Sequence, residues 1–155
     1  MKIVFLDIDG VLNDCYTTDN IIINDQRYTG LDIDKVERIN QIIISTEAKI
    51  VLSSTWRLYS EFVNYLKSRM KEVNPNLPKV LIDKTKDFAG ARGKVRADEI
   101  EEWMKGKTDI EKFIVLDDMR HDDLDRFGKS FFLTQYNSGL TEKITNKCIK
   151  LLNEP

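Results

Sequence analysis

The chain has 155 residues, of which 41% are hydrophobic and 32% charged, and its formal net charge is −2. This composition is typical of one soluble globular domain with its own core, and no apolar run approaches membrane-spanning length. The weak negative charge excludes a surface that is basic all over, as expected of a general nucleic-acid-binding protein, but is compatible with a local basic patch.

The cysteines and the N-terminal residues indicate the cellular compartment in which we expect the protein. Cys15 and Cys148 are far apart in the chain and form no C-x-x-C pattern. The opening residues, "MKIVFLDIDG", contain a short apolar run that ends in acids, unlike a signal peptide. We therefore expect a cytoplasmic protein with no disulfide framework and no membrane association.

Five apolar runs alternate with helical patterns along the chain. The runs cover residues 2–6, 49–53, 79–82, 112–116 and 130–134, and each is typical of a buried parallel strand. Apolar residues at helical spacing occupy residues 59–73, 100–104 and 144–151. This alternation predicts an α/β fold in a single domain, residues 1–155, with a parallel sheet of about five strands and helices on both faces. In such sheets ligands bind at the carboxyl ends of the strands.

The tetrapeptide LDID occurs twice, and the second copy predicts a helix start. It precedes an amphipathic stretch, and Asp34 and Glu37 have the D-x-x-E spacing of a capping box. Carboxylates at a helix N-terminus also interact favourably with the helix dipole. We interpret Asp32 and Asp34 as capping residues.

The first copy of LDID lies in a different setting. An apolar run leads directly to Asp7, Asp9 follows two residues later, and Gly10 permits a sharp turn. A D-x-D pair by itself is a weak signal, since polar residues are common at strand ends. Its interpretation as a functional site depends on whether related motifs follow elsewhere in the chain.

Three such motifs follow in order: "IVLSSTWR", "ARGKVRADEIEEW" and "FIVLDD". Together with "FLDIDGVLN" they resemble the four motifs of the haloacid dehalogenase (HAD) phosphatase superfamily. The stretches "SSTWR", "RADEIEEW", "VLDD" and "SGLT" resemble more closely the HAD domain of the Swiss army knife RNA repair proteins. The candidate residues in the three later motifs are Ser53, Ser54, Lys94, Arg96, Asp117 and Asp118.

The resemblance implies a three-layer Rossmann-like HAD fold with little or no cap, and a phosphomonoester hydrolase that depends on Mg²⁺. It implies that Asp7 is the nucleophile, forming an aspartyl-phosphate, and that Asp9 is the acid and base of the two half-reactions. The main-chain carbonyl of Asp9, together with Asp7 and Asp118 and with Asp117 close by, would hold the metal. A divalent metal offsets the negative charge of the phosphoryl group and orients it.

Two motif assignments remain open. Ser53 and Ser54 compete for the position that holds phosphoryl oxygens, and counting from the apolar run favours Ser54. Lys94 and Arg96 compete for the position that balances negative charge in the transition state. The general superfamily pattern favours Lys94, whereas the resemblance to the RNA repair proteins favours Arg96.

Further residues near the second and fourth motifs are candidates for lesser roles. Thr55, Arg57 and Arg96 are candidate substrate-binding residues, and an exposed helix-start position is an equally good interpretation of Arg57. We expect Trp56 to pack rather than to stack on a ligand. His121, the only histidine, is interpreted as a surface loop residue near the site.

The sequence indicates only broad classes of substrate. Residues 14–30 predict a small hairpin or flap rather than a cap domain, so the site should be open, which favours a bulky substrate such as a nucleic-acid end or a phosphoprotein. The resemblance to the RNA repair proteins makes a nucleic-acid phosphate end, or a nucleotide, the leading expectation. A basic stretch could contact a polynucleotide backbone, position a nucleotide phosphate or simply be solvated. Its basic residues are Lys84, Lys86, Arg92, Lys94 and Arg96. No obligate protein partner is indicated.

Two other function classes fit parts of the pattern. A receiver domain of two-component signalling also combines a phosphorylated Asp, Mg²⁺, a Ser or Thr and a Lys. There the acidic pair comes first and the lysine last, whereas in this chain the D-x-D comes first and the acidic pair last. A catalytically silent binding module with the HAD fold is the second alternative, and the intact set of Asp7, Asp9, Lys94 and Asp118 argues against it.

Overall fold

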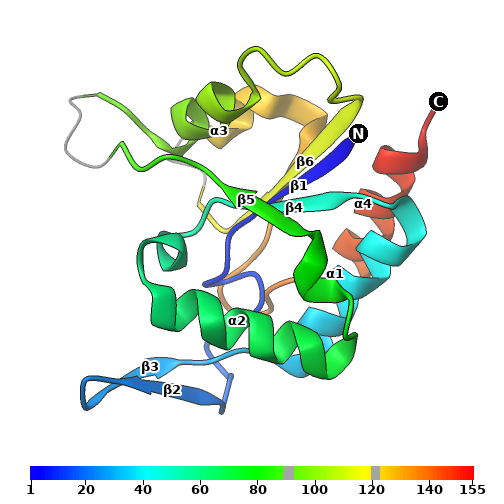
Figure 1. The fold of residues 1–155 in the computed structure, drawn as a ribbon. Coiled ribbons are helices and arrows are strands. Elements are labelled where there is room, and N and C mark those ends of the chain that lie inside the picture. The colour runs from blue at the N-terminus through cyan, green and yellow to red at the C-terminus, as the bar shows by residue number, and fades with distance from the viewer. Residues whose placement is uncertain (89–92, 120–122) are drawn as a thin grey trace.

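The computed structural model describes residues 1–88, 93–119 and 123–155. Its centre is a parallel sheet with the strand order β5-β4-β1-β6-β7 (Figure 1). The strands are β1 (Lys2–Leu6), β4 (Lys49–Leu52), β5 (Leu81–Lys84), β6 (Lys112–Asp117) and β7 (Phe131–Leu133). Four of the predicted strands are confirmed to within a residue at either end. The third begins later than expected because the 3₁₀ helix η2 (Leu77–Val80), with Pro78 in its first turn, takes up residues 79 and 80.

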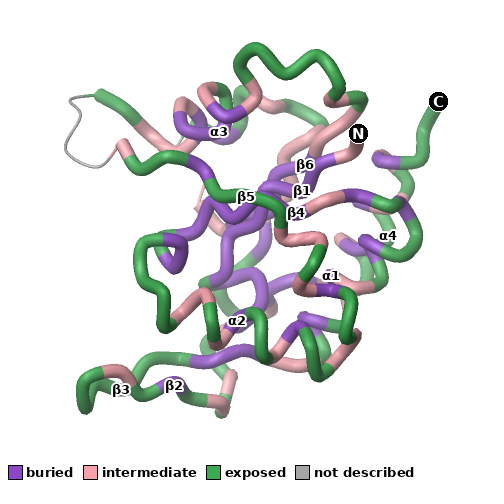
Figure 2. Tube along the Cα trace, in the orientation of Figure 1, coloured by how far each residue is buried: buried purple, intermediate pink, exposed green. Residues whose placement is uncertain are grey.

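Helices cover both faces of this sheet, as predicted. One face packs against α1 (Ile33–Thr46), α2 (Ser60–Val73) and α4 (Glu142–Asn153). The other packs against α3 (Arg96–Met104) and the 3₁₀ segment η3 (Leu124–Ser130). Figure 2 shows buried residues concentrated along the central strands between the two helical layers. The protein therefore has the three-layer, Rossmann-like α/β arrangement that the resemblance to the HAD superfamily implies.

Alternation along β1 divides the core into its two halves. Val4 and Leu6 pack under α1, α2 and α4, while Ile3 and Phe5 pack under α3. Successive side chains of a strand point to opposite faces, so a run that is apolar at every position is required when both faces are covered. The same alternation decides which polar residues beyond the strand end point toward α3.

The chain order places a topological switch point on the carboxyl edge of the sheet. From β1 the chain moves outward to β4 and β5, and it then returns to β6 on the other side of β1. The direction of winding thus reverses between β1 and β6. In open α/β sheets this switch point is where ligands bind, because the connections leave the two strand ends in opposite directions.

A short antiparallel hairpin occupies part of the segment for which a flap was expected. It consists of β2 (Asn20–Ile23) and β3 (Gln26–Thr29), joined by Asn24 and Asp25. Both turn residues have positive φ, 50° and 62°, as a two-residue type I′ turn requires, and Asn and Asp tolerate this region better than most residues. The hairpin projects below α2 (Figure 1), and the ring of Tyr28 packs edge-on against Phe62 of α2.

The second LDID copy does begin a helix, but the expected capping box is wrong. α1 has Asp32 as its N-cap, so Asp34 lies inside the first turn, where it pairs with Arg38 at 3.1 Å. The side chain of Asp32 makes no capping bond; it accepts hydrogen bonds from Thr17 and Lys35, both at 2.7 Å. None of the helices in the described ranges has both the length and the apolar character needed to span a membrane.

Candidate active site

Two carboxylates lie side by side where the central strands end. β1 and β6 pair in register with Leu6 opposite Leu116, so Asp7 and Asp117 come next at the carboxyl edge. The residues two positions earlier on both strands pack under α3, and alternation therefore directs both carboxylates toward α3. With Asp118 they form a cluster in which one oxygen from each residue lies within 4.8 Å of the others. The cluster lies at the switch point of the sheet.

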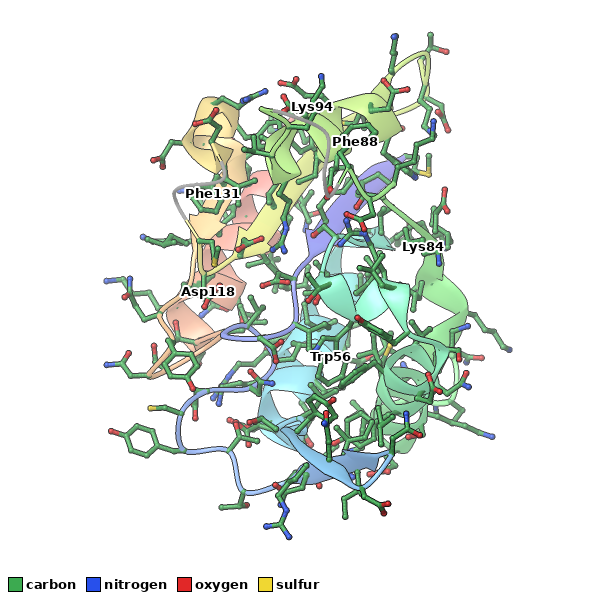
Figure 3. The ribbon with its side chains drawn as sticks, turned by 90° about the vertical axis from the view of Figure 1, so that its left-hand side faces the viewer. Trp56, Lys84, Phe88, Lys94, Asp118 and Phe131 are labelled. Atoms are coloured by element: carbon green, nitrogen blue, oxygen red, sulfur yellow. The ribbon has the colours of Figure 1, made fainter. Side chains whose placement is uncertain are left out.

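Arg96, not Lys94, provides the positive charge at this cluster. Arg96 is the first residue of α3, and its Nη1 lies 2.6 Å from Asp117 Oδ2 and 3.2 Å from Asp7 Oδ1. Lys94 is exposed, and its Nζ lies 5.9 Å from the ring centroid of Phe88. Figure 3 shows Lys94 beside Phe88 and well apart from Asp118. The expectation for Lys94 is corrected accordingly, because the residue precedes the helix that carries Arg96 to the strand ends.

The cluster carries more negative charge than one arginine neutralises. Burial, and next the charge of Asp117, raise the pKa of Asp7 from 3.8 to about 7, although Arg96 opposes the shift. Burial and the same neighbour raise the pKa of Asp118. Mg²⁺ prefers oxygen ligands and is bound in proteins through a few carboxylates. The donor set and the excess charge of these three residues fit such an ion.

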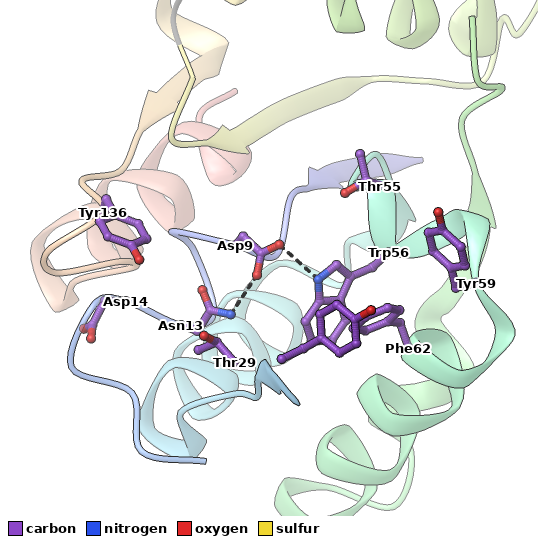
Figure 4. A pocket seen from close by; sticks show the side chains of 10 residues that line it. Asp9, Asn13, Asp14, Thr29, Thr55, Trp56, Tyr59, Phe62 and Tyr136 are labelled. Atoms are coloured by element: carbon purple, nitrogen blue, oxygen red, sulfur yellow. Dashed lines mark hydrogen bonds between the residues drawn. The ribbon is translucent and has the colours of Figure 1, made fainter. Parts of the chain in front are cut away.

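The carboxylate of Asp9 lies outside the cluster and is held separately. It is exposed, and it accepts hydrogen bonds from Asn13 Nδ2 at 2.9 Å and from Trp56 Nε1 at 3.1 Å (Figure 4). Asn13 also accepts a bond from the backbone N–H of Gly10 at 2.9 Å, which closes the turn after β1. Trp56 is buried as expected of a packing residue, and its indole N–H has this additional role. Asn13 was missed from the sequence, where its only signal is its place four residues after Asp9.

The structure favours Ser53 over Ser54 for the second motif, contrary to the expectation. The N–H of Ser53 donates to the carbonyl of Leu6 at 3.0 Å, so Ser53 is level with Asp7 at the sheet edge. Its hydroxyl is fully buried and has no hydrogen-bond partner among the described residues. The hydroxyl of Ser54 instead accepts a bond from the N–H of Trp56 at 3.2 Å and caps the 3₁₀ helix η1 (Thr55–Leu58).

Arg57 is a structural residue, which corrects both interpretations offered for it. Its side chain is only 3% exposed, unlike an ordinary surface arginine, and its Nε, Nη1 and Nη2 already donate to protein acceptors rather than being available to a substrate. It donates to four backbone carbonyls and to Glu99, with 2.7 Å between Nη2 and Glu99 Oε2. The guanidinium thereby joins the turn after β4, the segment after β5 and α3. Arg92 and His121 lie outside the described residues.

A pocket of about 400 Å³ opens beside Asp9, between the hairpin, η1 and α2. Thr55 is exposed and lies on its wall, consistent in position with the substrate contact expected of it. The other lining residues are largely aromatic. The site therefore consists of a charged part at the ends of β1 and β6 and an aromatic part beside Asp9.

Comparison with known families identifies the chain. Residues 3–144 match the family model described as the HAD domain in Swiss Army Knife RNA repair proteins. The chain belongs to this family. The motif-based resemblance to this HAD domain is thus confirmed over nearly the whole chain. The comparisons with curated proteins and with solved structures each found no match.

Gly10 of this HAD domain is required by close packing at the carboxylate cluster. Its φ is +75°, and a Cβ at this position would overlap the carboxylate of Asp118. We expect Gly10→Ala to lower the melting temperature and also to weaken stabilisation by Mg²⁺, because Asp118 must move. The positive φ contributes about 1–2 kcal/mol to the loss of stability.

The control for this variant is Gly106→Ala. Gly106 has a φ of +78°, but a Cβ added to it would meet no atom of the described residues within 4 Å, so its substitution carries the same backbone strain without a clash in the site. Thermal unfolding with and without Mg²⁺ separates the two effects. An equal response to Mg²⁺ in both variants would show that Gly10 matters only through its backbone conformation.

Proposed function

We propose that this HAD domain is a Mg²⁺-dependent phosphomonoester hydrolase that works through an aspartyl-phosphate on Asp7. The observation that carries the proposal is the cluster of Asp7, Asp117 and Asp118 at the switch point of the sheet, with Arg96 bound to two of the three carboxylates. Membership of the HAD family supports the same assignment. Phosphoryl transfer needs oxygen ligands for a metal, a nucleophile and a cation in one place, and this cluster supplies them.

Each residue of the charged cluster, and Asp9 beside it, has its own role in the proposed reaction. Mg²⁺ bound by Asp7, Asp117 and Asp118 would offset the charge of the phosphoryl group. A carboxylate oxygen of Asp7 attacks phosphorus, the bond to the ester oxygen breaks, and Asp9 gives a proton to the leaving alcohol. Asp9 then takes a proton from water as the water oxygen attacks phosphorus, which releases phosphate and restores Asp7. Arg96 stabilises the negative charge that develops on the phosphoryl oxygens.

The buried hydroxyl of Ser53 is suited to bind a phosphoryl oxygen in this scheme. We expect Ser53→Ala to lower kcat/KM by roughly 10²-fold, as is common for the loss of one donor to a reacting oxyanion. The free energy of unfolding should change little, because Ser53 Oγ makes no bond to the described residues.

Ser54→Ala provides the matched comparison. It removes the cap of η1 and should cost about 1 kcal/mol of stability, with a smaller effect on kcat/KM. Phosphate release and thermal unfolding of both variants check the assignment. A larger loss of kcat/KM in Ser54→Ala would reverse it.

We further propose nucleic-acid phosphate ends or nucleotides as substrates. The family description names RNA repair proteins, and the only insertion after β1 in the described chain is the small β2–β3 hairpin. A site with so small an insertion beside it has room for a phosphate on a large molecule. Cytoplasmic location is part of the same proposal, in keeping with the two free cysteines.

Phosphate release tests the activity. p-Nitrophenyl phosphate and oligonucleotides with a 3′- or a 5′-phosphate are incubated with the protein in Mg²⁺ and in EDTA. We expect release in Mg²⁺, none in EDTA, and recovery when Mg²⁺ is added back. Folded, Mg²⁺-loaded protein that releases phosphate from none of them would contradict the proposal and would favour a binding module without turnover.

A further inference from the structure

The pocket beside Asp9 is separate from the charged part of the site. The carboxylate of Asp9 lines it, whereas Asp7, Asp117 and Asp118 do not. In the proposed reaction Asp9 gives its proton to the leaving oxygen, so the group bonded to that oxygen must lie on the side of Asp9. The pocket is therefore placed to hold the alcohol half of the substrate, and the charged cluster to hold the phosphoryl half.

Aromatic rings from separate parts of the chain form the walls of this pocket. They belong to Tyr28 of β3, Trp56 of η1, Tyr59 next to α2, Phe62 of α2 and Tyr136 of the turn after β7. Figure 4 shows Tyr136 on one side of Asp9 and three of the other rings on the opposite side. The rings on that opposite side are packed together, with centroid distances to Phe62 of 4.8 to 5.9 Å.

Three of these rings are exposed, which core packing does not explain. The exposed fractions are 38% for Tyr28, 57% for Tyr59 and 63% for Tyr136. Exposed apolar groups that gather at one hollow, rather than lying scattered, mark a binding surface. Among the described residues, the only other exposed tyrosine is Tyr16, and it does not line the pocket.

We propose that this pocket binds the base of the nucleotide that carries the phosphate, by stacking it against the aromatic walls. This inference rests on the proposed function, because that function places the leaving group at Asp9. Stacking on aromatic side chains tolerates every base, since each has a flat face. The lining also includes the hydroxyls of Thr29 and Thr55, which can meet the polar edge of a base. A volume of about 400 Å³ lies in the range of small-molecule pockets and exceeds what a single phenyl ring requires.

A pair of substrates that differ only in the base tests the proposal. One is an oligonucleotide whose terminal, phosphate-bearing residue has its base, and the other has an abasic sugar at the same position. We expect kcat/KM to be roughly ten-fold or more higher for the base-bearing end. Tyr59→Ala and Tyr136→Ala should remove most of this preference, while Tyr16→Ala, exposed at 77% and outside the pocket, should keep it.

Two outcomes of this comparison would overturn the base pocket. If the base-bearing and the abasic oligonucleotide ends have equal kcat/KM, the base pocket is contradicted, while the phosphatase activity that both ends report still supports the proposed function. A phosphotyrosine peptide hydrolysed in preference to every nucleotide would assign the pocket to a protein side chain instead.

A binding measurement that needs no turnover tests the base pocket separately from the proposed phosphatase activity. The fluorescence of Trp56 is followed in a Trp103→Phe variant as adenosine, which has no phosphate, is added. Trp103 lies on the α3 side of the sheet, against Phe5. We expect adenosine to quench the Trp56 emission in a saturable way and Tyr59→Ala to weaken this quenching. In Trp56→Phe, which keeps Trp103 as its tryptophan, adenosine should leave the emission unchanged. Quenching without phosphate release would contradict the phosphatase alone, and phosphate release without quenching would contradict the base pocket.

Discussion

Asp7→Asn is expected to slow phosphate release by on the order of 10⁴-fold or more, because an amide has no free carboxylate oxygen to attack phosphorus. The same variant should be more stable than the wild-type protein in EDTA at pH 8. Asparagine has nearly the shape of aspartate, yet it removes a buried charge that lies beside Asp117 and Asp118. Loss of activity together with a gain in stability would mark Asp7 as a residue kept for chemistry at the expense of the fold.

The pH dependence of this gain follows from the pKa of Asp7. Burial, and next the charge of Asp117, raise the pKa in the folded protein from 3.8 to about 7, so the folded state holds the proton more tightly than the unfolded state. The wild-type protein therefore loses stability as pH rises from about 4 to about 7, and the loss is complete above that window. Asp7→Asn escapes this loss, so its advantage in EDTA should be largest at pH 8 and should shrink toward pH 4.

Thermal unfolding at pH 4, 6 and 8, in EDTA and in Mg²⁺, measures these effects. Mg²⁺ should raise the melting temperature of the wild-type protein at pH 8 and should raise that of Asp7→Asn less. Asp25→Asn, on the exposed hairpin turn, is the isosteric control and should behave as the wild type. A metal-free Asp7→Asn less stable than the wild type at pH 8 would mean that Arg96 already neutralises the cluster.

The sheet and the acidic cluster could be predicted because each depends on local patterns and one topological rule. Runs that are apolar at every position indicate strands covered on both faces, and parallel strands bring their carboxyl ends to one edge. Asp7, Asp117 and Asp118 follow such runs, so their meeting requires no knowledge of packing. The resemblance to the HAD motifs added the chemical roles proposed for these residues, which the patterns alone do not give.

The two open assignments depended on registers that the sequence does not contain. Ser53 is level with Asp7 only because β4 and β1 pair with Leu52 opposite Leu6. Arg96 reaches the carboxylates only because α3 begins at this residue, four positions before the first apolar residue that marked the helix in the sequence. A shift of one residue in the strand register would place Ser54 rather than Ser53 beside Asp7, and a shift in the helix start would likewise change which basic residue reaches the carboxylates. Hydrophobic periodicity does not resolve such small shifts.

The aromatic pocket could not be predicted because its residues are brought together only by the fold. Tyr28 and Tyr136 are separated from each other by most of the chain, and each reads as an isolated surface aromatic. Trp56 was expected to pack, which it does, but its bond to Asp9 depends on where η1 lies relative to the turn after β1. Contacts of this kind depend on three-dimensional placement rather than on sequence spacing.

Arg57→Ala is expected to destabilise the protein by about 3–5 kcal/mol, the range found when one member of a buried ion pair is removed. The guanidinium is 3% exposed and Glu99 is 9% exposed, so the variant leaves a buried carboxylate without its partner. It also removes the guanidinium donors from four backbone carbonyls, among them those of Ser53 and Thr85, although the Ser54 carbonyl keeps the backbone N–H of residue 57 as a donor. Arg57→Lys should restore little, because an ammonium cannot reproduce the planar, five-donor geometry of the guanidinium.

Urea unfolding measures this loss, and Arg126→Ala is the control. Arg126 also pairs with carboxylates of α3, those of Asp98 and Glu101, but on the surface, where such pairs contribute at most about 1 kcal/mol. A loss in Arg57→Ala no larger than that in Arg126→Ala would mean that water replaces the guanidinium at low cost.

A double variant separates stability from positioning. Arg57→Met with Glu99→Leu removes both charges and should recover much of the stability, since apolar pairs often replace buried ion pairs without loss. It should not recover phosphate release, because the bonds of Arg57 fix Ser53 from one side and α3, with Arg96 at its start, from the other. A double variant that is both stable and fully active would assign the pair to stability alone. A stable but slow one would show that this buried pair aligns the two halves of the phosphate site.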